Sequence, residues 1–348
     1  MFSYGPTAPT TLSIDWGGPE LTEPSTILHK RFSVVSSNMA RRPKFKPSFR
    51  KKGQSEGDRK RLQEVAETTL AVIERGMVTV DGIHHDITAK VDFMKNNTCY
   101  YSPDSQLSSS WSTATRSSDL SSHKCEISIL EMTTLQAAQL LRDTLSNSHS
   151  KSGRVGLLNF GDATSPGGGF LVGLPAQEET IARSSTLYAS LMTDTAQQFY
   201  NLHRSDKKRG FYHHALIYTP DVVVLRNDAG DWVPPYDVDI VTSAAVNAGA
   251  VRRQNGKRVA REETEKQIES TMRERMARIL FTFEQQGSNN IILGGFGTGV
   301  FRNKVEVVAR LWRELLVGDN ARFNTSFDRV VFGIVGKQTF TTFKDVFS

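Results

Sequence analysis

The pattern of hydrophobic and polar positions becomes regular only near residue 58. Residues 1 to 55 mix Pro, Ser, Thr and charged residues with no sustained period, which is typical of a disordered segment. From Asp58, a stripe at helical spacing indicates an amphipathic helix that ends at Gly76, and its members are Leu62, Val65, Thr69, Val72 and Ile73. Short strands are expected next, over 78–80, 83–87 and 98–101.

From Cys125 the pattern alternates between strands and helices, which indicates an α/β domain with a largely parallel sheet. Strands are predicted at 126–130, 155–160, 215–225, 238–246, 290–293 and 327–335, and helices at 133–145, 177–191, 261–286 and 305–317. The interval 102–122 carries ten serines and little apolar content, so we expect an exposed loop or insertion there. The chain is thus divided into a disordered basic arm over 1–55 and one domain over 56–348, with an N-terminal extension over 56–124.

The strand at 155–160 leads into the stretch with the most chemistry. It is followed by three consecutive glycines at 167–169, and without a Cβ these residues let backbone N–H groups lie close against a ligand. Such a loop suits phosphate or ribose. A helix is expected to open just after Pro175, and its first residues are Gln177, Glu178 and Glu179. Two carboxylates are therefore predicted to face a glycine loop.

A second glycine-rich loop follows the strand at 290–293 and precedes a helix. Its sequence is Gly294-Gly-Phe-Gly-Thr-Gly-Val-Phe301. A dinucleotide fold would place Gly-x-Gly-x-x-Gly after the first strand, and this loop has neither that spacing nor that position. A phosphate loop does not require that form, so the segment stays a candidate for phosphate binding.

Composition and charge narrow the class of protein. With 348 residues, of which 38% are hydrophobic, the chain can bury a sizeable core. No run approaches the roughly 18 apolar residues of a membrane span, and the N-terminus lacks the features of a signal peptide. Two cysteines, Cys99 and Cys125, make no disulfide framework, so we expect reduced thiols in a cytoplasmic or nuclear protein.

The net charge of +6 is concentrated in one segment. Between Lys30 and Arg61, 12 basic residues stand against Glu56 and Asp58, which gives this segment +10 and leaves −4 for the rest of the chain. The segment is a candidate for contact with a polyanion such as DNA, RNA or poly(ADP-ribose), or for a nuclear-import patch. The alternative is a solvated disordered arm that binds nothing.

The triple glycine followed at this distance by Gln-Glu-Glu resembles the signature of the poly(ADP-ribose) glycohydrolases, specifically the smaller microbial type built on a macrodomain. The similarity extends over roughly 58–346 and includes the segments 218–226 and 242–249 and the late glycine loop. It implies a three-layer α/β/α macrodomain with a mixed, largely parallel central sheet and an N-terminal extension of helix and strands. It also implies hydrolysis of ribose–ribose bonds in poly(ADP-ribose), with no metal and no cofactor.

The reaction and the resemblance together assign the site residues. Cleaving a glycosidic bond passes through an oxocarbenium-like state, so a carboxylic acid should protonate the leaving hydroxyl and then activate water. Glu179 is the candidate for that acid, and Glu178 and Gln177 would orient the leaving ribose. By resemblance, ADP-ribose is bound by Asn159, Asp162, Gly167, Gly168, Gly169, Gly294, Gly295, Phe296, Gly297, Thr298, Gly299, Val300 and Phe301, with Phe301 beside the terminal ribose. A branched side chain at Gly168 is expected to enter the glycine cradle and abolish binding.

Other functions fit parts of the same sequence. One is a macrodomain reader that binds ADP-ribose without hydrolysing it, although binding alone has no need for the acids at 178 and 179. Another is a hydrolase for mono-ADP-ribosylated protein or another ADP-ribose derivative. His84 and His85 do not suggest a metal, because adjacent residues on a strand point to opposite faces.

Overall fold

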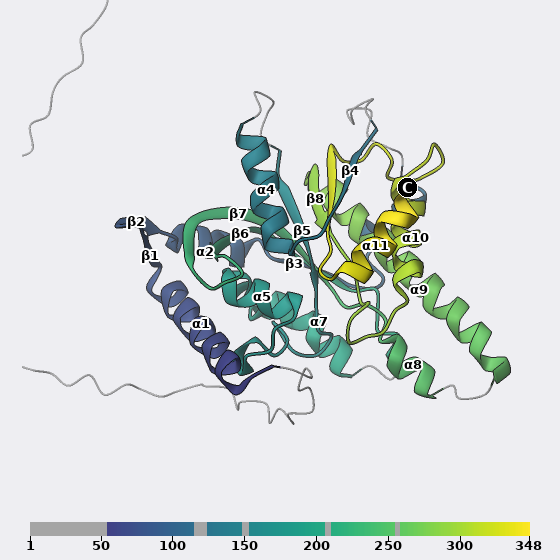
Figure 1. The fold of residues 1–348 in the computed structure, drawn as a ribbon, viewed down its shortest axis with the longest axis horizontal. Helices are drawn as coiled ribbons and strands as arrows, with labels where there is room; N and C mark the ends of the chain where they lie inside the picture. The colour runs from purple at the N-terminus through teal and green to yellow at the C-terminus, as the bar shows by residue number, and fades with distance from the viewer. Residues whose placement is uncertain (1–53, 115–123, 148–152, 206–209, 255–257) are drawn as a thin grey trace, which may run out of the picture. The chain divides into compact units, whose positions relative to one another are not determined.

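Among the residues that the computed structural model describes, seven strands form a central mixed sheet in the order β3-β6-β7-β5-β8-β9-β4 (Figure 1). Their bounds are Cys99–Tyr101 (β3), Glu126–Leu130 (β4), Val155–Phe160 (β5), Leu216–Arg226 (β6), Trp232–Ser243 (β7), Asn290–Leu293 (β8) and Arg329–Gly333 (β9). The pairs β5–β7, β5–β8, β8–β9 and β4–β9 are parallel, whereas β6 pairs antiparallel with β3 and β7. A separate hairpin joins β1 (Met77–Val80) to β2 (Ile83–Asp86).

The structure describes residues 54–114, 124–147, 153–205, 210–254 and 258–348. The residues from Lys51 onward cluster into one unit. Apart from its last two residues, the predicted basic arm over 1–55 lies outside the described residues. The same holds for 115–122, the last eight residues of the serine-rich interval.

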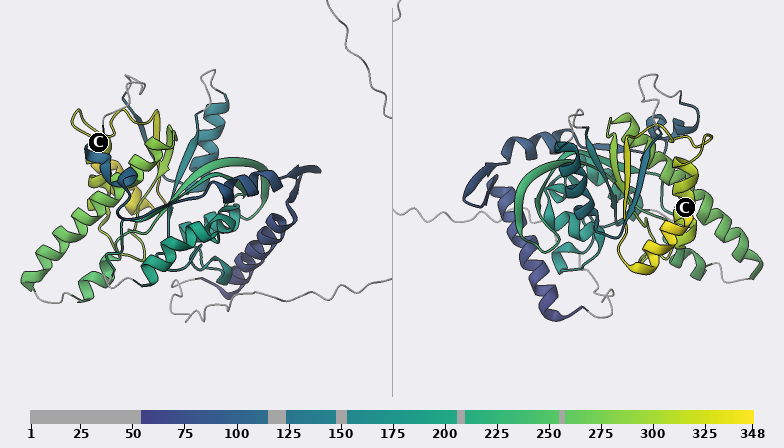
Figure 2. Two further views of the ribbon diagram at one scale, coloured as in Figure 1. Left: turned by 180° about the vertical axis from the view of Figure 1, so that it is seen from behind. Right: turned by 45° about the horizontal axis from the view of Figure 1, so that its top comes forward.

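Helices cover both faces of the sheet. On one face lie α1 (Glu56–Arg75), α2 (Thr88–Asn96), α4 (Thr134–Ser146), α5 (Gln177–Ser184), α6 (Leu187–Leu191) and α7 (Asp194–Arg204). On the other lie α8 (Ala248–Gln254), α9 (Arg258–Gln285), α10 (Val305–Leu316) and α11 (Lys337–Phe347). Strand alternation separates the two cores, because Leu157 points into the first and its neighbour Leu158 into the second. The result is the predicted three-layer α/β/α arrangement (Figure 2).

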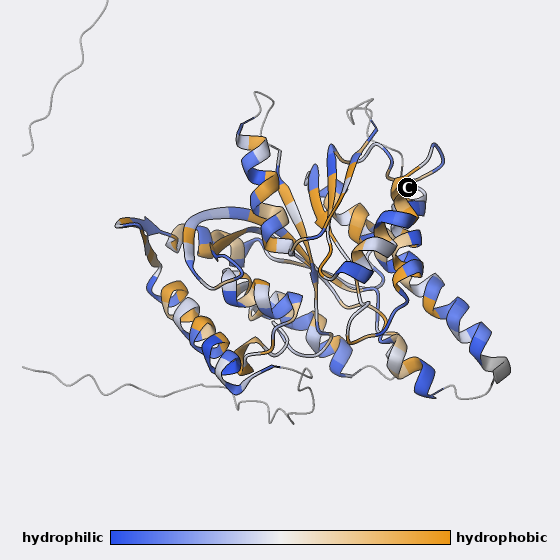
Figure 3. Ribbon diagram, viewed as in Figure 1, coloured by the Kyte–Doolittle hydropathy of each residue, from blue (hydrophilic) through white to orange (hydrophobic). Residues whose placement is uncertain are grey.

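Hydropathy follows these layers. The strands of the sheet and the adjoining sides of the helices carry most of the hydrophobic colour in Figure 3, whereas residues 261–267 of α9 are mainly hydrophilic. At the start of the domain, α1 begins with a capping box between Ser55 and Asp58 and ends at Gly76, whose φ of 75° terminates the helix. This confirms the helix and the glycine stop that the sequence predicted.

Three parts of the secondary structure differ from the sequence prediction. The helix expected over 177–191 is two helices, because Ser185 is extended and forms a bridge with Val224 of β6, which interrupts the helical turn. Residues 106–112 of the serine-rich interval form α3 (Gln106–Ser109) and a 3₁₀ turn (Ser110–Ser112), and the Trp111 indole donates to Glu274 at 2.9 Å. Besides α3, four helices of the described residues were not predicted, namely α2, α7, α8 and α11.

Candidate active site

The site is built where β5 ends and α5 begins, and Gln177 joins the two. The Gln177 side-chain oxygen accepts the N–H of Phe160 at 2.9 Å, and its amide nitrogen donates to the Leu158 carbonyl at 2.7 Å. The same nitrogen donates to Thr134 at 3.2 Å. At the end of β5, the Gln177 side chain therefore makes the hydrogen bonds that a neighbouring strand would otherwise make. Its amide holds the backbone of β5, and its contact with the leaving ribose stays a prediction.

The two glutamates each accept a backbone N–H from a different end of the glycine loop. The Glu178 carboxylate accepts from Asp162 at 2.6 Å, and the Glu179 carboxylate accepts from Gly169 at 3.0 Å. Both side chains are buried, with 4% of Glu178 and 8% of Glu179 exposed. Together these bonds draw the loop 161–176 around the first turn of α5.

Gly168 lies directly against these carboxylates. Its φ is +58°, and a Cβ there would lie 2.6 Å from Glu179 Oε1 and 3.1 Å from Glu178 Oε2. Gly167, with a φ of +66°, faces Phe170 and Tyr188, and a Cβ at Gly169 would lie 2.4 Å from Leu174. The glycines are thus needed because the carboxylates and the loop's own side chains fill the space that a Cβ would occupy.

Both glutamates are held in environments that favour the neutral acid. Burial raises the pKa of Glu178 well above its usual value, and the nearby charges of Asp162 and Glu179 raise it further. Burial also raises the pKa of Glu179, while the Gly169 N–H and the positive charge of Arg183 act in the opposite direction. A protonated carboxylic acid in a buried site is what general-acid catalysis requires.

Asn159 and Asp162, which were predicted from the sequence to reach the ribose, both lie beside Glu178. Asn159 is fully buried and donates to Thr242 at 3.1 Å, while its Oδ1 and Glu178 Oε1 find no hydrogen-bond donor within the described part of the chain. Buried polar atoms without a partner indicate a place for a ligand or water. The Asp162 carboxylate uses Oδ1 to accept from Thr164 and Ser165, so this residue also forms the turn of the loop.

The late glycine loop starts beside the first one. Gly294 leaves β8, the parallel neighbour of β5, and the Phe160 and Phe296 rings lie 5.7 Å apart. Phe296 is fully buried and Thr298 hydrogen-bonds the Gly295 carbonyl, so these residues shape the loop from inside. Gly299 and Val300 are at its outer turn, where 67% of Val300 is exposed. Of the two aromatic side chains in this loop, Phe296 is buried and Phe301 is partly exposed.

A third strand end contributes residues that the sequence did not single out as site residues. The segment after β7 packs under the late loop, since a Cβ at Gly297 would lie 2.4 Å from Ala245 Cβ. Asn303 donates to the Val246 and Gly297 carbonyls at 2.8 and 3.0 Å and ties the two loops together. Tyr212 lies with its ring 6.1 Å from Phe301. The available signal was that 242–249 follows a strand in a parallel sheet, whose carboxyl edge gathers ligand-binding loops.

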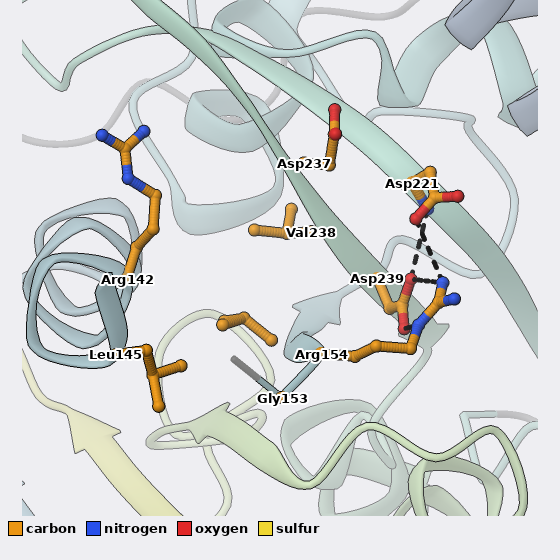
Figure 4. A pocket seen from close by; sticks show the side chains of 9 residues that line it. Arg142, Leu145, Gly153, Arg154, Asp221, Asp237, Val238 and Asp239 are labelled. Atoms are coloured by element: carbon orange, nitrogen blue, oxygen red, sulfur yellow. Dashed lines mark hydrogen bonds and ion pairs between the residues drawn. The ribbon is translucent and has the colours of Figure 1, made fainter. Parts of the chain in front are cut away.

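A hollow of about 250 Å³ lies at the opposite edge, around the start of β5 (Figure 4). Arg154 reaches the buried Asp239 and also Asp221, while Asp237 pairs with Lys90 and Arg142 lies beside Asp143. The charged side chains that line this hollow are thus paired with one another or with neighbours. We therefore assign these ion pairs to stabilisation of the fold at this edge. Among the described residues no group of three His, Cys, Asp or Glu side chains is arranged to hold a metal, and no helix is long and apolar enough to cross a membrane.

Comparisons with known proteins show which proteins have a similar sequence and fold. The family model for the catalytic domain of microbial-type poly(ADP-ribose) glycohydrolase matches residues 66–227. The crystal structure of poly(ADP-ribose) glycohydrolase from Thermomonospora curvata is 34% identical, has a TM-score of 0.72 and covers 83% of this chain and 100% of that chain. The same enzyme bound to the inhibitor ADP-HPD is 33% identical, with a TM-score of 0.69 over 82% of this chain and 99% of that chain.

A third structure, the glycohydrolase from Deinococcus radiodurans in complex with ADP-ribose, is 31% identical with a TM-score of 0.62 over 77% of this chain and 98% of that chain. A comparison with curated proteins finds no match. The layers, the sheet order and the loops at its carboxyl edge define a macrodomain-like α/β protein. This chain belongs to the microbial-type poly(ADP-ribose) glycohydrolases, which confirms the family resemblance of the sequence.

Proposed function

We propose that this protein hydrolyses the ribose–ribose bonds of poly(ADP-ribose) with Glu179 as general acid and base. The observation that carries the proposal is the placement of Glu179, which is buried, hydrogen-bonded by Gly169 and in contact range of Gly168 within the glycine loop. Family membership supports the reaction type, and the relatives were solved with ADP-ribose and with ADP-HPD.

The proposed reaction has two proton transfers through one carboxyl group. The protonated Glu179 gives its proton to the oxygen of the leaving ribose as the glycosidic bond breaks, and positive charge develops at the anomeric carbon. Glu179, now a carboxylate, takes a proton from water while the hydroxyl of that water bonds to the anomeric carbon. ADP-ribose is released and Glu179 returns to its acid form. Burial, which raises the pKa of Glu179, favours the form that begins this cycle.

The remaining residues are proposed to hold the substrate. Asn159 Oδ1 and Glu178 Oε1, which have no donor among the described residues, are suited to receive ribose hydroxyls. The N–H groups of the late loop around Gly299 are suited to the diphosphate, and Phe301 to the face of a ribose. Bound diphosphate would also offset the positive charge that forms at the anomeric carbon.

The biological setting is also part of the proposal. A polymer or an ADP-ribosylated protein is the expected partner, and the cytoplasm or nucleus is the expected compartment, since Cys99 and Cys125 are free thiols. Contact between the basic N-terminal segment and a polyanion stays a prediction from charge alone.

The test is release of ADP-ribose from purified poly(ADP-ribose) by the wild type and by Glu179→Gln, with ADP-ribose binding measured calorimetrically on both. A glutamine oxygen still accepts the Gly169 N–H, so the variant should bind ADP-ribose normally and release none. Equal activity of the two proteins would disprove the role of Glu179. Binding without release by the wild type would favour a reader, and release only from mono-ADP-ribosylated protein would change the substrate.

A further inference from the structure

The end of the glycine loop presents four consecutive backbone carbonyls, at residues 171–174, and each accepts a hydrogen bond from a long side chain. Gln63 donates to Leu171 at 3.5 Å, Arg59 to Val172 at 2.7 Å, Gln54 to Gly173 at 2.7 Å, and Arg183 to Leu174 at 2.9 and 2.8 Å. Carbonyls outside a strand ladder must find other partners, and here three of the four donors come from α1 or the residue preceding its cap.

The bonds from Arg59 continue to the proposed acid through the backbone. Arg59 Nε holds the carbonyl of Val172, whose own N–H donates to the Gly169 carbonyl at 3.1 Å. The N–H of Leu174 donates to the same carbonyl at 3.2 Å. The Gly169 N–H in turn donates to Glu179 at 3.0 Å. Three successive hydrogen bonds therefore connect α1 to the carboxyl group of Glu179.

Side-chain packing also holds the end of the glycine loop against α1. Phe170 is buried in a small cluster with Ala66 of α1 and Ala182 of α5, and the Tyr188 ring lies 4.6 Å from its own. Gly173 approaches α1 so closely that a Cβ would lie 2.4 Å from the Arg59 carbonyl oxygen, and its φ is +73°. The loop and the helix thus fit together only with glycine at this position.

We propose that Gln54, Arg59 and Gln63 form a clasp that holds the loop end so that Gly169 stays hydrogen-bonded to Glu179, which makes Arg59 a positioning residue for the reaction. The catalytic half of this inference rests on the proposed function, whereas the structural half concerns only the Gly169–Glu179 bond. A residue outside the matched family region, which starts at residue 66, would then set the chemistry of the glutamate.

The clasp predicts a change in the pKa of Glu179 when Arg59 is replaced, which a mere loss of protein stability would not produce. The Gly169 N–H lowers the pKa of Glu179, so a loosened loop should raise that pKa. We would titrate the full chain with carbon-13-labelled glutamate by NMR, using Glu179→Gln to assign the resonance. Arg59→Ala should raise the Glu179 pKa, and Arg59→Lys, whose ammonium group can also donate to Val172, should restore it in large part.

Two further variants separate the clasp from an unrelated effect of the arginine. Gly173→Ala breaks the same contact from the loop side and should raise the pKa in the same direction. Arg75→Ala is the matched control, because Arg75 also lies on α1 and donates to a backbone carbonyl, that of Met77, away from the loop. It should leave the pKa unchanged. If Arg59→Ala does not fold, Gln54→Ala offers a milder loss of one bond.

Activity is measured in parallel on poly(ADP-ribose). We expect Arg59→Ala to lower kcat by about 10- to 100-fold, with its high-pH limb moved to higher pH and ADP-ribose binding nearly unchanged. An unchanged Glu179 pKa in folded Arg59→Ala and Gly173→Ala would overturn the clasp. A wild type that releases no ADP-ribose would overturn the proposed function alone, because the NMR titration still reports on the clasp.

Discussion

The two glycine loops resemble one another in sequence but differ in what surrounds them. In the first loop, a Cβ at Gly168 would meet the carboxyl groups of Glu179 and Glu178. At the outer turn of the late loop, a Cβ at Gly299 would meet no atom within 4 Å in the described part of the chain. The first loop is thus filled by the protein itself, while the late loop leaves room beside its backbone.

This difference predicts separate tasks for the two loops. A loop packed against buried glutamates and held by α1 can fix the geometry of a reacting group. A loop with an open outer turn can let phosphate oxygens approach its N–H groups. We therefore expect changes in the first loop to lower kcat and changes in the late loop to weaken substrate binding, which kinetic constants distinguish.

The largest effect is expected from Gly168→Ala. The new methyl would displace the Glu179 carboxylate, and alanine would also be strained at a φ of +58°. We expect kcat to fall by about 100-fold or more in steady-state assays of ADP-ribose release. Gly299→Ala is the matched control in the late loop, where the methyl fits. Equal losses of kcat in the two variants would remove the distinction between the loops.

A smaller effect is expected from Phe301→Ala in the late loop. If Phe301 lies beside the ribose as proposed, loss of its aromatic face should weaken ADP-ribose binding by up to about 10-fold, with a much smaller change in kcat. Calorimetry with ADP-ribose measures the affinity, and Phe301→Tyr should retain most of it. Full affinity in the alanine variant would show that the ligand does not reach this residue.

Burial of the glutamates should give the first loop a pH-dependent stability. Because the pKa of Glu178 is raised in the folded state, its contribution to stability is present below its usual pKa of 4.5 and is lost as pH rises through the folded value. Glu178→Gln removes this loss and keeps an oxygen for the Asp162 N–H. We expect a Tm about 2–4 °C above the wild type at pH 7 to 8, and no difference near pH 4. An equal difference at both pH values would contradict burial of a titrating acid.

The smallest effect is expected from the N-terminal segment. Removing residues 1–50 should leave ADP-ribose release from short polymers within about twofold of the wild type, since the described contacts of the domain begin at Gln54. Extending the deletion through residue 60 removes the donors at 54 and 59 and should lower kcat sharply. If the shorter deletion already abolishes activity, the predicted boundary of the domain is wrong.

Local patterns predicted much of the fold and placed the candidate residues on their elements. The helix stop at Gly76 and the start of α5 after Pro175 depend on backbone preferences of single residues, so they could be read directly. The break between α5 and α6 could not, because Ser185 pairs with Val224, which is 39 positions further along the chain. Likewise α11 buries Phe343 against Phe332, and only the finished sheet provides that surface.

The sequence by itself determined the family of the protein and singled out the candidate site residues, because a triple glycine followed by consecutive glutamates is a specific pattern. Only the tertiary structure decided what each one faces. The predicted meeting of carboxylates and glycine loop takes its form at Gly168, where an added Cβ would meet Glu179, and the side chain of Gln177 is used by the backbone of β5. Burial, close approach and the pKa of a carboxylic acid depend on neighbours from distant parts of the chain, so they exist only after β5, α5 and α1 have come together.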